Sequence, residues 1–188
     1  MQDETGTSLT PPTTDRNGPA SAPAAGRSRL YTLVGITALL TLVADQGTKV
    51  WALASLTPGE PRPLIGEWIR LNLIRNSGAA FSLGNSRTWL LTILSIVIIV
   101  GVLVTVRRVA SRPWALTFGA LLGGAVGNLL DRLFRAPGLF RGHVVDFLDY
   151  FGLFIGNVAD IAIVLAAVVV VWLTLRGEPA TATGGRHD

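Results

Sequence analysis

The chain contains no cysteine and only two histidines among its 188 residues. The absence of cysteine excludes a disulfide framework, a cysteine-ligated zinc or iron–sulfur site and a thiol nucleophile. His143 and His187 are too few for a histidine-based metal site or a Ser–His–Asp triad. We therefore expect no metal and no cofactor, and carboxylates become the natural candidates for catalysis.

Charged residues are also scarce. They make up 15% of the chain, against about 25% in a soluble domain, while 49% of the residues are hydrophobic and the mean hydropathy is +0.49. Such a chain lacks the polar surface that water requires, so we expect much of it to lie in lipid. The net charge is +4, but no basic run is interleaved with aromatic residues, which argues against nucleic acid and favours anionic lipid as the counter-charge.

Four hydrophobic blocks predict four transmembrane helices. The longest uncharged block has nineteen residues, enough to span about 30 Å of hydrocarbon at 1.5 Å per residue. The first and last blocks reach spanning length only if the acid beside each lies within the membrane boundary. Gly119, Gly123 and Gly127 repeat every four residues in the third block, a spacing that lets helices approach closely in lipid. The blocks are Leu30–Ala44, Thr88–Val106, Pro113–Leu130 and Ile161–Leu175.

These blocks predict an all-α polytopic membrane protein. We expect a disordered tail over residues 1–28, a four-helix transmembrane domain over residues 29–176 and a second tail over residues 177–188. An even number of spans places both tails on one side of the membrane and the loops Thr48–Arg87 and Arg132–Gly156 on the other. The short loop between the second and third blocks carries three arginines and no acid, which predicts cytoplasmic tails.

The acids in the body of the chain converge on one membrane face. Five of them are aspartates, and the expected topology places all five at the outer face, where one ends the first helix, one ends the third and one opens the fourth. Ionisable groups at the membrane are costly, so such residues are functional candidates. In chain order the five are Asp45, Asp131, Asp146, Asp149 and Asp160.

Neighbouring residues suggest structural roles for three of these acids. Lys49, the only lysine, stands four residues after Asp45, where it can form an ion pair. Asp131 and Arg132 are expected to form a buried ion pair that orients helix ends. Asp149 is expected to be a solvated loop acid.

Asp146 and Asp160 differ because neither has an obvious cationic partner. Asp146 has apolar neighbours, which penalise its ionisation, whereas Asp160 lies at a helix start, where the helix dipole favours the charged form. Two carboxylates brought together share a proton, so one can activate water while the other acts as an acid. From these residues alone, a catalytic pair competes with structural or proton-relay roles for the same two acids.

Five short stretches of the chain resemble the lipoprotein signal peptidases (signal peptidase II), a family of bacterial membrane aspartyl proteases. The stretches occur in the family's order and run from the first hydrophobic block to the fourth, about two-thirds of the chain. Each stretch alone is a weak signal, and five in order are a strong one. They are Asp45–Lys49, Asn72–Ser82, Gly123–Arg132, Val144–Phe147 and Asn157–Asp160.

The resemblance implies a fold and an enzymatic activity. The fold has four transmembrane helices with a small extracytoplasmic β-rich element and a short amphipathic helix on the outer face. The imperfect alternation over Leu64–Leu73 is compatible with a short strand or an interfacial segment there. The implied activity is the cleavage of prolipoproteins just before a diacylglyceryl-modified cysteine, in the bacterial cytoplasmic membrane. The implied partners are therefore lipidated prolipoproteins and membrane lipid, and the oligomeric state stays open.

The resemblance also implies roles for individual residues. It maps the catalytic pair to Asp146 and Asp160. Gly156 stands where the family usually has phenylalanine, so the entry to the fourth helix is expected to pack differently, and the stretch between the two acids is shorter than in many relatives. The positions that line or support the site are Asp45, Lys49, Asn76, Asn128, Asp131, Arg132 and Asn157.

Two alternatives remain from the residues. A small proton-coupled transporter or channel subunit would use the aspartate cluster as a relay, with acids distributed through the depth of the membrane. A Ser–Lys protease would use Lys49 as its base and Ser77 or Ser82 as its nucleophile.

Overall fold

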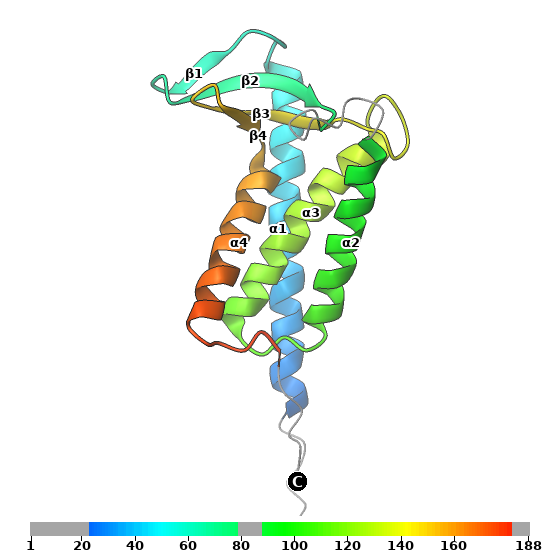
Figure 1. Ribbon diagram of the computed structural model, residues 1–188, viewed down its shortest axis with the longest axis vertical. Coiled ribbons are helices and arrows are strands. Elements are labelled where there is room, and N and C mark those ends of the chain that lie inside the picture. Colours follow the sequence, from blue (N-terminus) through cyan, green and yellow to red (C-terminus); the bar gives the residue numbers. More distant parts are fainter. Residues whose placement is uncertain (1–22, 79–87, 182–188) are drawn as a thin grey trace, which may run out of the picture.

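The computed structural model describes residues 23–78 and 88–181, with side chains from Gly26 onward. Four long helices stand side by side, and a four-stranded antiparallel sheet lies across one end of the bundle (Figure 1). The first residues of the first helix and the last residues of the fourth lie at the opposite end, as an even number of spans requires. The elements are α1 (Pro23–Ser55), β1 (Arg62–Ile65), β2 (Ile69–Asn76), α2 (Thr88–Val106), α3 (Arg112–Phe134), β3 (Val144–Tyr150), β4 (Phe154–Gly156) and α4 (Val158–Leu175).

The outer surface of the bundle is apolar. Each of the four helices among the described residues is long and apolar enough to cross a membrane, which confirms the predicted spans. Large hydrophobic side chains point away from the bundle, including Leu40, Val97 and Val168, which are 65%, 60% and 60% exposed. Water-soluble proteins rarely expose so large an apolar surface, whereas a bilayer solvates it and leaves the backbone bonds inside each helix.

Helix α1 extends beyond the predicted block at both ends. It begins at Pro23, inside the stretch expected to be a disordered tail, and residues 1–22 lie outside the described part of the chain. It also continues through Asp45 to Ser55, so the prediction that Asp45 ends this helix is wrong. The helix accommodates the acid because Lys49, one turn further on, pairs with one carboxylate oxygen and the backbone N–H of Ala159 donates to the other.

The predicted C-terminal tail begins as a packed segment. The backbone N–H of Ala110 donates to the carbonyl oxygen of Ala180, and Thr181 forms an isolated bridge with Val109. The indole N–H of Trp114 donates to the carbonyl oxygen of Glu178 at 3.2 Å. These bonds attach the chain after α4 to the connection between α2 and α3, while residues 182–188 lie outside the described part.

The sheet is the β-rich element that the resemblance implied. Its strands follow one another in the order β1-β2-β3-β4, and the segment Leu64–Leu73 forms a hairpin whose turn contains Gly66 with a φ of +51°. Pairing of β2 with β3 places Ile74 opposite Asp146. Strand β4 leads directly into α4, so the sheet positions both Asp146 and the start of that helix. The described residues contain no short amphipathic helix of the kind that the family implies.

Glycines of α3 bring three helices close together, as their spacing predicted. A Cβ atom at Gly123 would collide with the carbonyl oxygen of Ala38 in α1. A Cβ atom at Gly124 would come within 2.8 Å of the carbonyl oxygen of Ala159 in α4. Helix α3 therefore lies between α1 and α4 at backbone contact, which brings short polar side chains of all three helices within reach of one another.

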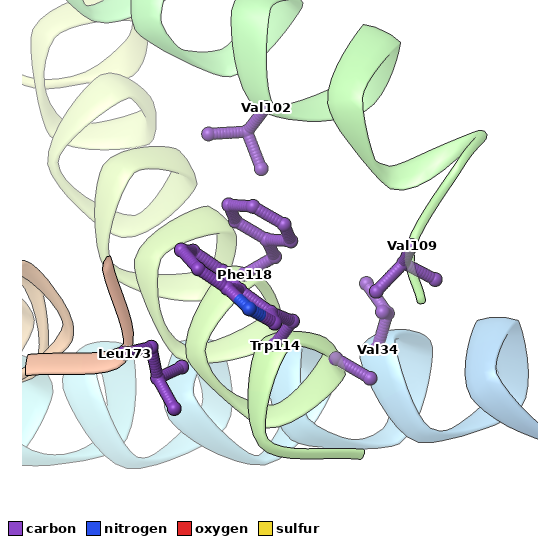
Figure 2. Close-up of a cluster of buried hydrophobic side chains, with 7 residues drawn as sticks. Val34, Val102, Val109, Trp114, Phe118 and Leu173 are labelled. Carbon is purple, nitrogen blue, oxygen red and sulfur yellow. The ribbon is translucent and has the colours of Figure 1, made fainter. Parts of the chain in front are cut away.

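Two apolar clusters lie toward the two ends of the bundle. At the end away from the sheet, the rings of Trp114 and Phe118 pack with centroids 5.3 Å apart, and side chains from α1, α2 and α4 surround them (Figure 2). Beneath the sheet, Ala52 of α1 and Leu56, which directly follows α1, pack on Leu73, Val145 and Phe147 of the strands. The buried polar residues of α1 fall between these two clusters.

Candidate active site

Four of the five aspartates highlighted by the sequence belong to one polar network beneath the sheet. The network draws on α1, α3 and α4, on strands β2 and β3, and on the residues that directly follow α3 and directly precede α4. The acids that the topology placed on one membrane face therefore meet in space. The network comprises Asp45, Gln46, Lys49, Asn76, Asn128, Asp131, Arg135, Asp146, Asn157 and Asp160.

Asp146 lies on β3 and is held by two neutral amides. The side chain is 1% exposed. Its Oδ1 accepts from Asn157 Nδ2 at 2.6 Å, and its Oδ2 accepts from Asn76 Nδ2 at 2.7 Å. The backbone N–H of Gly78 donates to Asn76 Oδ1, which fixes that amide with its nitrogen toward Asp146. Both carboxylate oxygens thus have a donor, and neither donor carries a charge.

Asp160 lies in the first turn of α4, where Asn157 is the N-cap. The two residues form a capping box: the backbone N–H of Asp160 donates to Asn157 Oδ1, and the backbone N–H of Asn157 donates to Asp160 Oδ2. The other oxygen of Asp160 accepts from Asn128 Nδ2 at 2.9 Å. Asn157 therefore donates to the carboxylate of Asp146 from its side chain and to the carboxylate of Asp160 from its backbone, so one residue orients both acids.

Lys49 is fully buried at the centre of the ion pairs. Its ammonium nitrogen lies 2.9 Å from each of three acceptors, which are Asp45 Oδ2, Asp131 Oδ2 and Asn128 Oδ1. An ammonium has three N–H donors, so all of them are used. The predicted Asp45–Lys49 pair is present, and Asp131 shares the same cation.

The charges of these ion pairs balance without Asp146 and Asp160. Arg135 pairs with Asp131, so the carboxylates of Asp45 and Asp131 face the cations of Lys49 and Arg135. Within the described residues, neither Asp146 nor Asp160 has an ion pair. This agrees with the sequence, which offered neither acid a cationic partner.

The predicted Asp131–Arg132 ion pair is wrong. Asp131 pairs instead with Lys49 and Arg135 and accepts the backbone N–H of Val145 at 3.1 Å. The physical reason is helical geometry, because side chains four residues apart lie on one face whereas adjacent ones do not. Arg132 is buried, and its Nη1 has no hydrogen-bond partner among the described residues. It lies near enough to Asp146 to interact with its charge.

Asp149 is not the solvated loop acid that the sequence predicted. It lies in β3 with 1% of its surface exposed, and Arg70 Nη2 pairs with it at 2.9 Å. The β2–β3 register places Arg70 directly opposite Asp149, and the N–H of Gly152 donates to its other oxygen. Asp149 therefore belongs to the sheet and not to the network beneath it.

The protonation of Asp146 follows from its surroundings. Burial and the negative charge of Asp160 raise the pKa of Asp146 from 3.8 to about 7, although the hydrogen bonds from Asn76 and Asn157 act in the opposite direction. A carboxyl group with this pKa can hold or release a proton near neutral pH, as a pair that shares one proton requires. Such a pair offers an acid and a base at the same moment.

Two members of the network were not predicted from the sequence. Arg135 could have been found, because it stands four residues after Asp131 at the end of a helix. Gln46 lies in the stretch Asp45–Lys49 that resembles the family, but no role was predicted for it. Its Nε2 donates to Asp45 Oδ2 and to the carbonyl oxygen of Gly127, both at 3.0 Å, which joins α1 to α3.

Gly156, the departure from the family pattern, is buried between Phe154 and Asp160. A Cβ atom at this position would come within 2.7 Å of the Phe154 ring and 3.0 Å of Asp160 Oδ2. The ring of Phe154 therefore fills the space that a larger side chain at position 156 would need. Beside it, an apolar pocket of about 300 Å³ opens next to Asp160.

Comparisons with known proteins agree on one family. A family model described as Signal peptidase (SPase) II matches residues 37–176, which include the whole polar network. Proteins named lipoprotein signal peptidase are similar over most of the chain. The one from Mycolicibacterium smegmatis is 44% identical over 100% of this chain and 79% of its own length. Those from Mycobacterium tuberculosis and Streptomyces coelicolor are 45% and 44% identical over 90% and 81% of this chain, and over 83% and 74% of their own lengths.

Two solved structures of bacterial membrane enzymes share the fold. Their TM-scores are 0.64 and 0.66, at 23% and 22% sequence identity. The similarity covers 75% and 80% of this chain, and 91% and 92% of theirs. At these identities the likeness concerns the arrangement of helices and strands alone.

Proposed function

The chain belongs to the signal peptidase II family of proteases, and on that premise we propose that it removes signal peptides from prolipoproteins with Asp146 and Asp160 as its catalytic pair. The observation that carries the proposal is a contrast between two kinds of aspartate in one network. Asp45 and Asp131 are neutralised by cations, whereas Asp146 and Asp160 are held only by amide and backbone donors. Asp146 and Asp160 can therefore gain or lose a proton without breaking an ion pair.

The reaction needs one proton shared by the two acids. The ionised carboxylate takes a proton from water as the water oxygen bonds to the scissile carbonyl carbon, and the protonated carboxyl gives its proton to the carbonyl oxygen. When the tetrahedral intermediate collapses, the carbon–nitrogen bond breaks and the first carboxyl protonates the leaving amine. The second carboxylate then takes a proton from the intermediate's hydroxyl, which restores the pair.

Arg132 supplies a donor for the substrate. Its Nη1 is buried without a hydrogen-bond partner among the described residues, and its charge acts on both Asp146 and Asp160. A substrate carbonyl beside the pair satisfies this donor, which favours one orientation of the peptide. Buried unpaired donors are costly, so a substrate that pairs this one gains binding energy.

The substrate class rests on the resemblance and on the position of the pair. We propose cleavage just before a diacylglyceryl-modified cysteine, because the acids lie at the ends of membrane-spanning helices, where a lipid-anchored peptide arrives through the bilayer. We also propose that both termini are cytoplasmic and that the pair lies near the outer face. The arginine-rich connection between α2 and α3 supports this orientation.

The two alternatives fit the geometry less well. A proton relay would distribute acids along the depth of the membrane, whereas these acids gather at the sheet end of the bundle. A Ser–Lys protease needs a neutral lysine beside a serine, but the Lys49 ammonium donates to Asp45, Asp131 and Asn128. No serine among the described residues is bonded to Lys49, and Ser82 lies outside them.

The proposal is tested by cleavage of a diacylglyceryl-modified prolipoprotein by the purified protein. We expect Asp146→Asn and Asp160→Asn each to lower turnover by about 10³-fold, since each removes one proton carrier. Asp149→Asn is the matched control, because this buried aspartate lies on the same strand as Asp146 but outside the network. It should keep turnover when equal amounts of folded protein are compared.

Three outcomes would overturn the proposal or a part of it. Retained turnover in Asp146→Asn or Asp160→Asn would remove the aspartyl mechanism, and loss of activity in Lys49→Ala with a tolerated Asp160→Asn would favour the Ser–Lys alternative. Equal rates for the lipidated and the unlipidated precursor would refute the substrate class.

A further inference from the structure

An apolar pocket of about 300 Å³ lies directly against one of the two proposed catalytic acids. Asp160 and Tyr150 are the two lining residues whose side chains carry polar atoms. The other lining side chains have no hydrogen-bonding group, so the wall of the pocket is almost entirely apolar. Those side chains are Phe154, Ile161, Val164 and Leu165.

The pocket faces the bilayer and not the interior of the bundle. Val164 and Leu165 are 60% and 59% exposed on the outer face of α4. The opposite wall is aromatic, since the rings of Tyr150 and Phe154 stack with centroids 6.2 Å apart. Gly156 makes this wall possible, because a Cβ atom there would meet the Phe154 ring.

The apolar surface continues along α4 toward the middle of the membrane. Leu165 also lines a second apolar cavity of about 560 Å³ between α3 and α4, which extends to Leu116, Ala120 and Val169. At 1.5 Å per residue, the helix axis between Asp160 and Val169 is ~14 Å long. The linings of the two pockets share Leu165, so apolar side chains line the surface of α4 from beside Asp160 to Val169.

We propose that this pocket binds one acyl chain of the substrate's diacylglyceryl cysteine, an inference that rests on the function proposed above. The lipid is attached to the residue that follows the scissile bond, so its chains must leave the catalytic pair within a few bonds. Among the described pockets, this one is lined by a catalytic acid, is apolar and opens to lipid. An acyl chain has no donor or acceptor, which matches such walls.

The pocket contributes more to the positioning of the lipidated substrate than to its binding affinity. An acyl chain that moves from the bilayer into an apolar pocket exchanges one hydrocarbon environment for another, so little free energy is gained from burial itself. What the pocket fixes is the direction in which the lipid leaves the cysteine. That direction sets the scissile carbonyl relative to Asp160, and a small misplacement there lowers the rate strongly.

The first test fills the pocket with a larger side chain. Val164→Trp blocks it, and Val168→Trp is the matched control, because Val168 has the same residue type and the same 60% exposure one turn further along α4 but lines neither cavity. Each variant is assayed on two prolipoprotein peptides, one whose cysteine carries long acyl chains and one with very short chains.

The expected pattern is specific to one variant and one substrate. Val164→Trp should lower kcat/KM for the long-chain peptide about tenfold, mainly through kcat, and change it less than twofold for the short-chain peptide. Val168→Trp should stay within twofold for both. Equal effects of the two variants, or equal effects of Val164→Trp on the two peptides, would overturn the acyl-chain site.

The second test locates the chain without catalysis. In the Asp146→Asn protein, a lipidated peptide with a photoreactive group on one acyl chain should label α4 around Val164 and Leu165, and an excess of bilayer lipid should not remove the label. Labelling of α2, or loss of the label to bulk lipid, would overturn the inference. If the wild type fails to cleave any lipidated prolipoprotein, the proposed function itself is wrong. If the wild type cleaves the substrate but the photoreactive chain labels another part of the protein, only the proposed acyl-chain site is wrong.

Discussion

The side-chain oxygen of Asn128 accepts a hydrogen bond from the ammonium of Lys49 at 2.9 Å. The same amide donates from its nitrogen to Asp160 at 2.9 Å, so one residue joins the buried ion pairs to the proposed catalytic pair. Because an ammonium can only donate, the side-chain amide of Asn128 cannot flip its oxygen and nitrogen while Lys49 is charged. Lys49 therefore orients a donor toward Asp160 as well as neutralising Asp45 and Asp131.

Replacing Lys49 should strongly destabilise the protein. Lys49→Met leaves the carboxylates of Asp45 and Asp131 buried with Arg135 as the remaining cation, and breaking a buried ion pair costs about 3–5 kcal/mol. The measurement is thermal unfolding in detergent, with cleavage assayed below the unfolding temperature.

The control for Lys49→Met is Arg70→Met. It removes the partner of Asp149 on the sheet, but Arg70 is 32% exposed, so water reaches that pair and Gly152 still donates to the acid. We expect a smaller loss of stability and no loss of turnover. Equal losses in the two variants would contradict the view that burial decides the effect.

The raised pKa of Asp146 predicts that stability and activity both depend on pH. Its pKa is about 7 in the folded protein because of burial and the charge of Asp160, against 3.8 for an ordinary aspartate. Between these two values the folded state binds more protons than the unfolded state, so this contribution to stability is complete below about pH 4 and is lost as the pH rises through about 7.

Activity should fall over the upper part of the same range. The mechanism needs one proton on the pair, so kcat/KM should decline as the pH rises through about 7. Thermal unfolding at several pH values should show the corresponding slope in the wild type and a weaker one in Asp146→Asn, which has no titrating proton at this position. A wild-type rate that is constant across neutral pH would contradict the shared proton.

Gly127 keeps space for the Asp45 carboxylate. A Cβ atom at this position would collide with Asp45 Oδ2, the oxygen that pairs with Lys49. We expect Gly127→Ala to cost about 1–3 kcal/mol of stability through overpacking. Gly101→Ala in α2 is the control, because a Cβ atom there meets nothing within 4 Å. A loss as large in Gly101→Ala would show that the helices tolerate no added methyl group, whatever its neighbours.

The sequence predicted those parts of the fold that depend on solvent and on local spacing. Long uncharged blocks predicted the spans because lipid solvates apolar helices, and the four-residue glycine repeat predicted close packing of α3. The i, i+4 spacing of Asp45 and Lys49 predicted their ion pair. The even number of spans was enough to bring distant acids to one end of the bundle.

Long-range partners account for what was missed. Helix α1 continues past Asp45 because Ala159, far along the chain, donates to that acid. Asp149 is buried because the register between β2 and β3 places Arg70 opposite it, and a register cannot be read from one strand. The double role of Asn157 depends on a helix cap and a strand meeting in space, which no single stretch of sequence shows.

The packing around Gly156 predicts a pair of compensating substitutions. Gly156→Phe, which installs the residue usual in the family, should collide with the Phe154 ring and displace the Asp160 carboxylate, lowering turnover about tenfold or more. Adding Phe154→Gly removes the colliding ring and should restore most of the activity. Turnover of lipidated peptide in the single and double variants measures this. A double variant no better than Gly156→Phe alone would mean that the space is set by other residues.

The absence of cysteine makes the orientation of the chain directly measurable. Glu60, before β1, and Arg108, in the arginine-rich connection between α2 and α3, are both exposed and lie at opposite ends of the bundle. Arginines in short loops are retained on the cytoplasmic side. In intact spheroplasts, a membrane-impermeant maleimide should therefore label Glu60→Cys, and it should label Arg108→Cys only after permeabilisation. The unsubstituted chain provides a blank without thiols. Labelling with the sides reversed would place the aspartate pair at the cytoplasmic face, where a prolipoprotein exported across the membrane could not present its cleavage site to these acids.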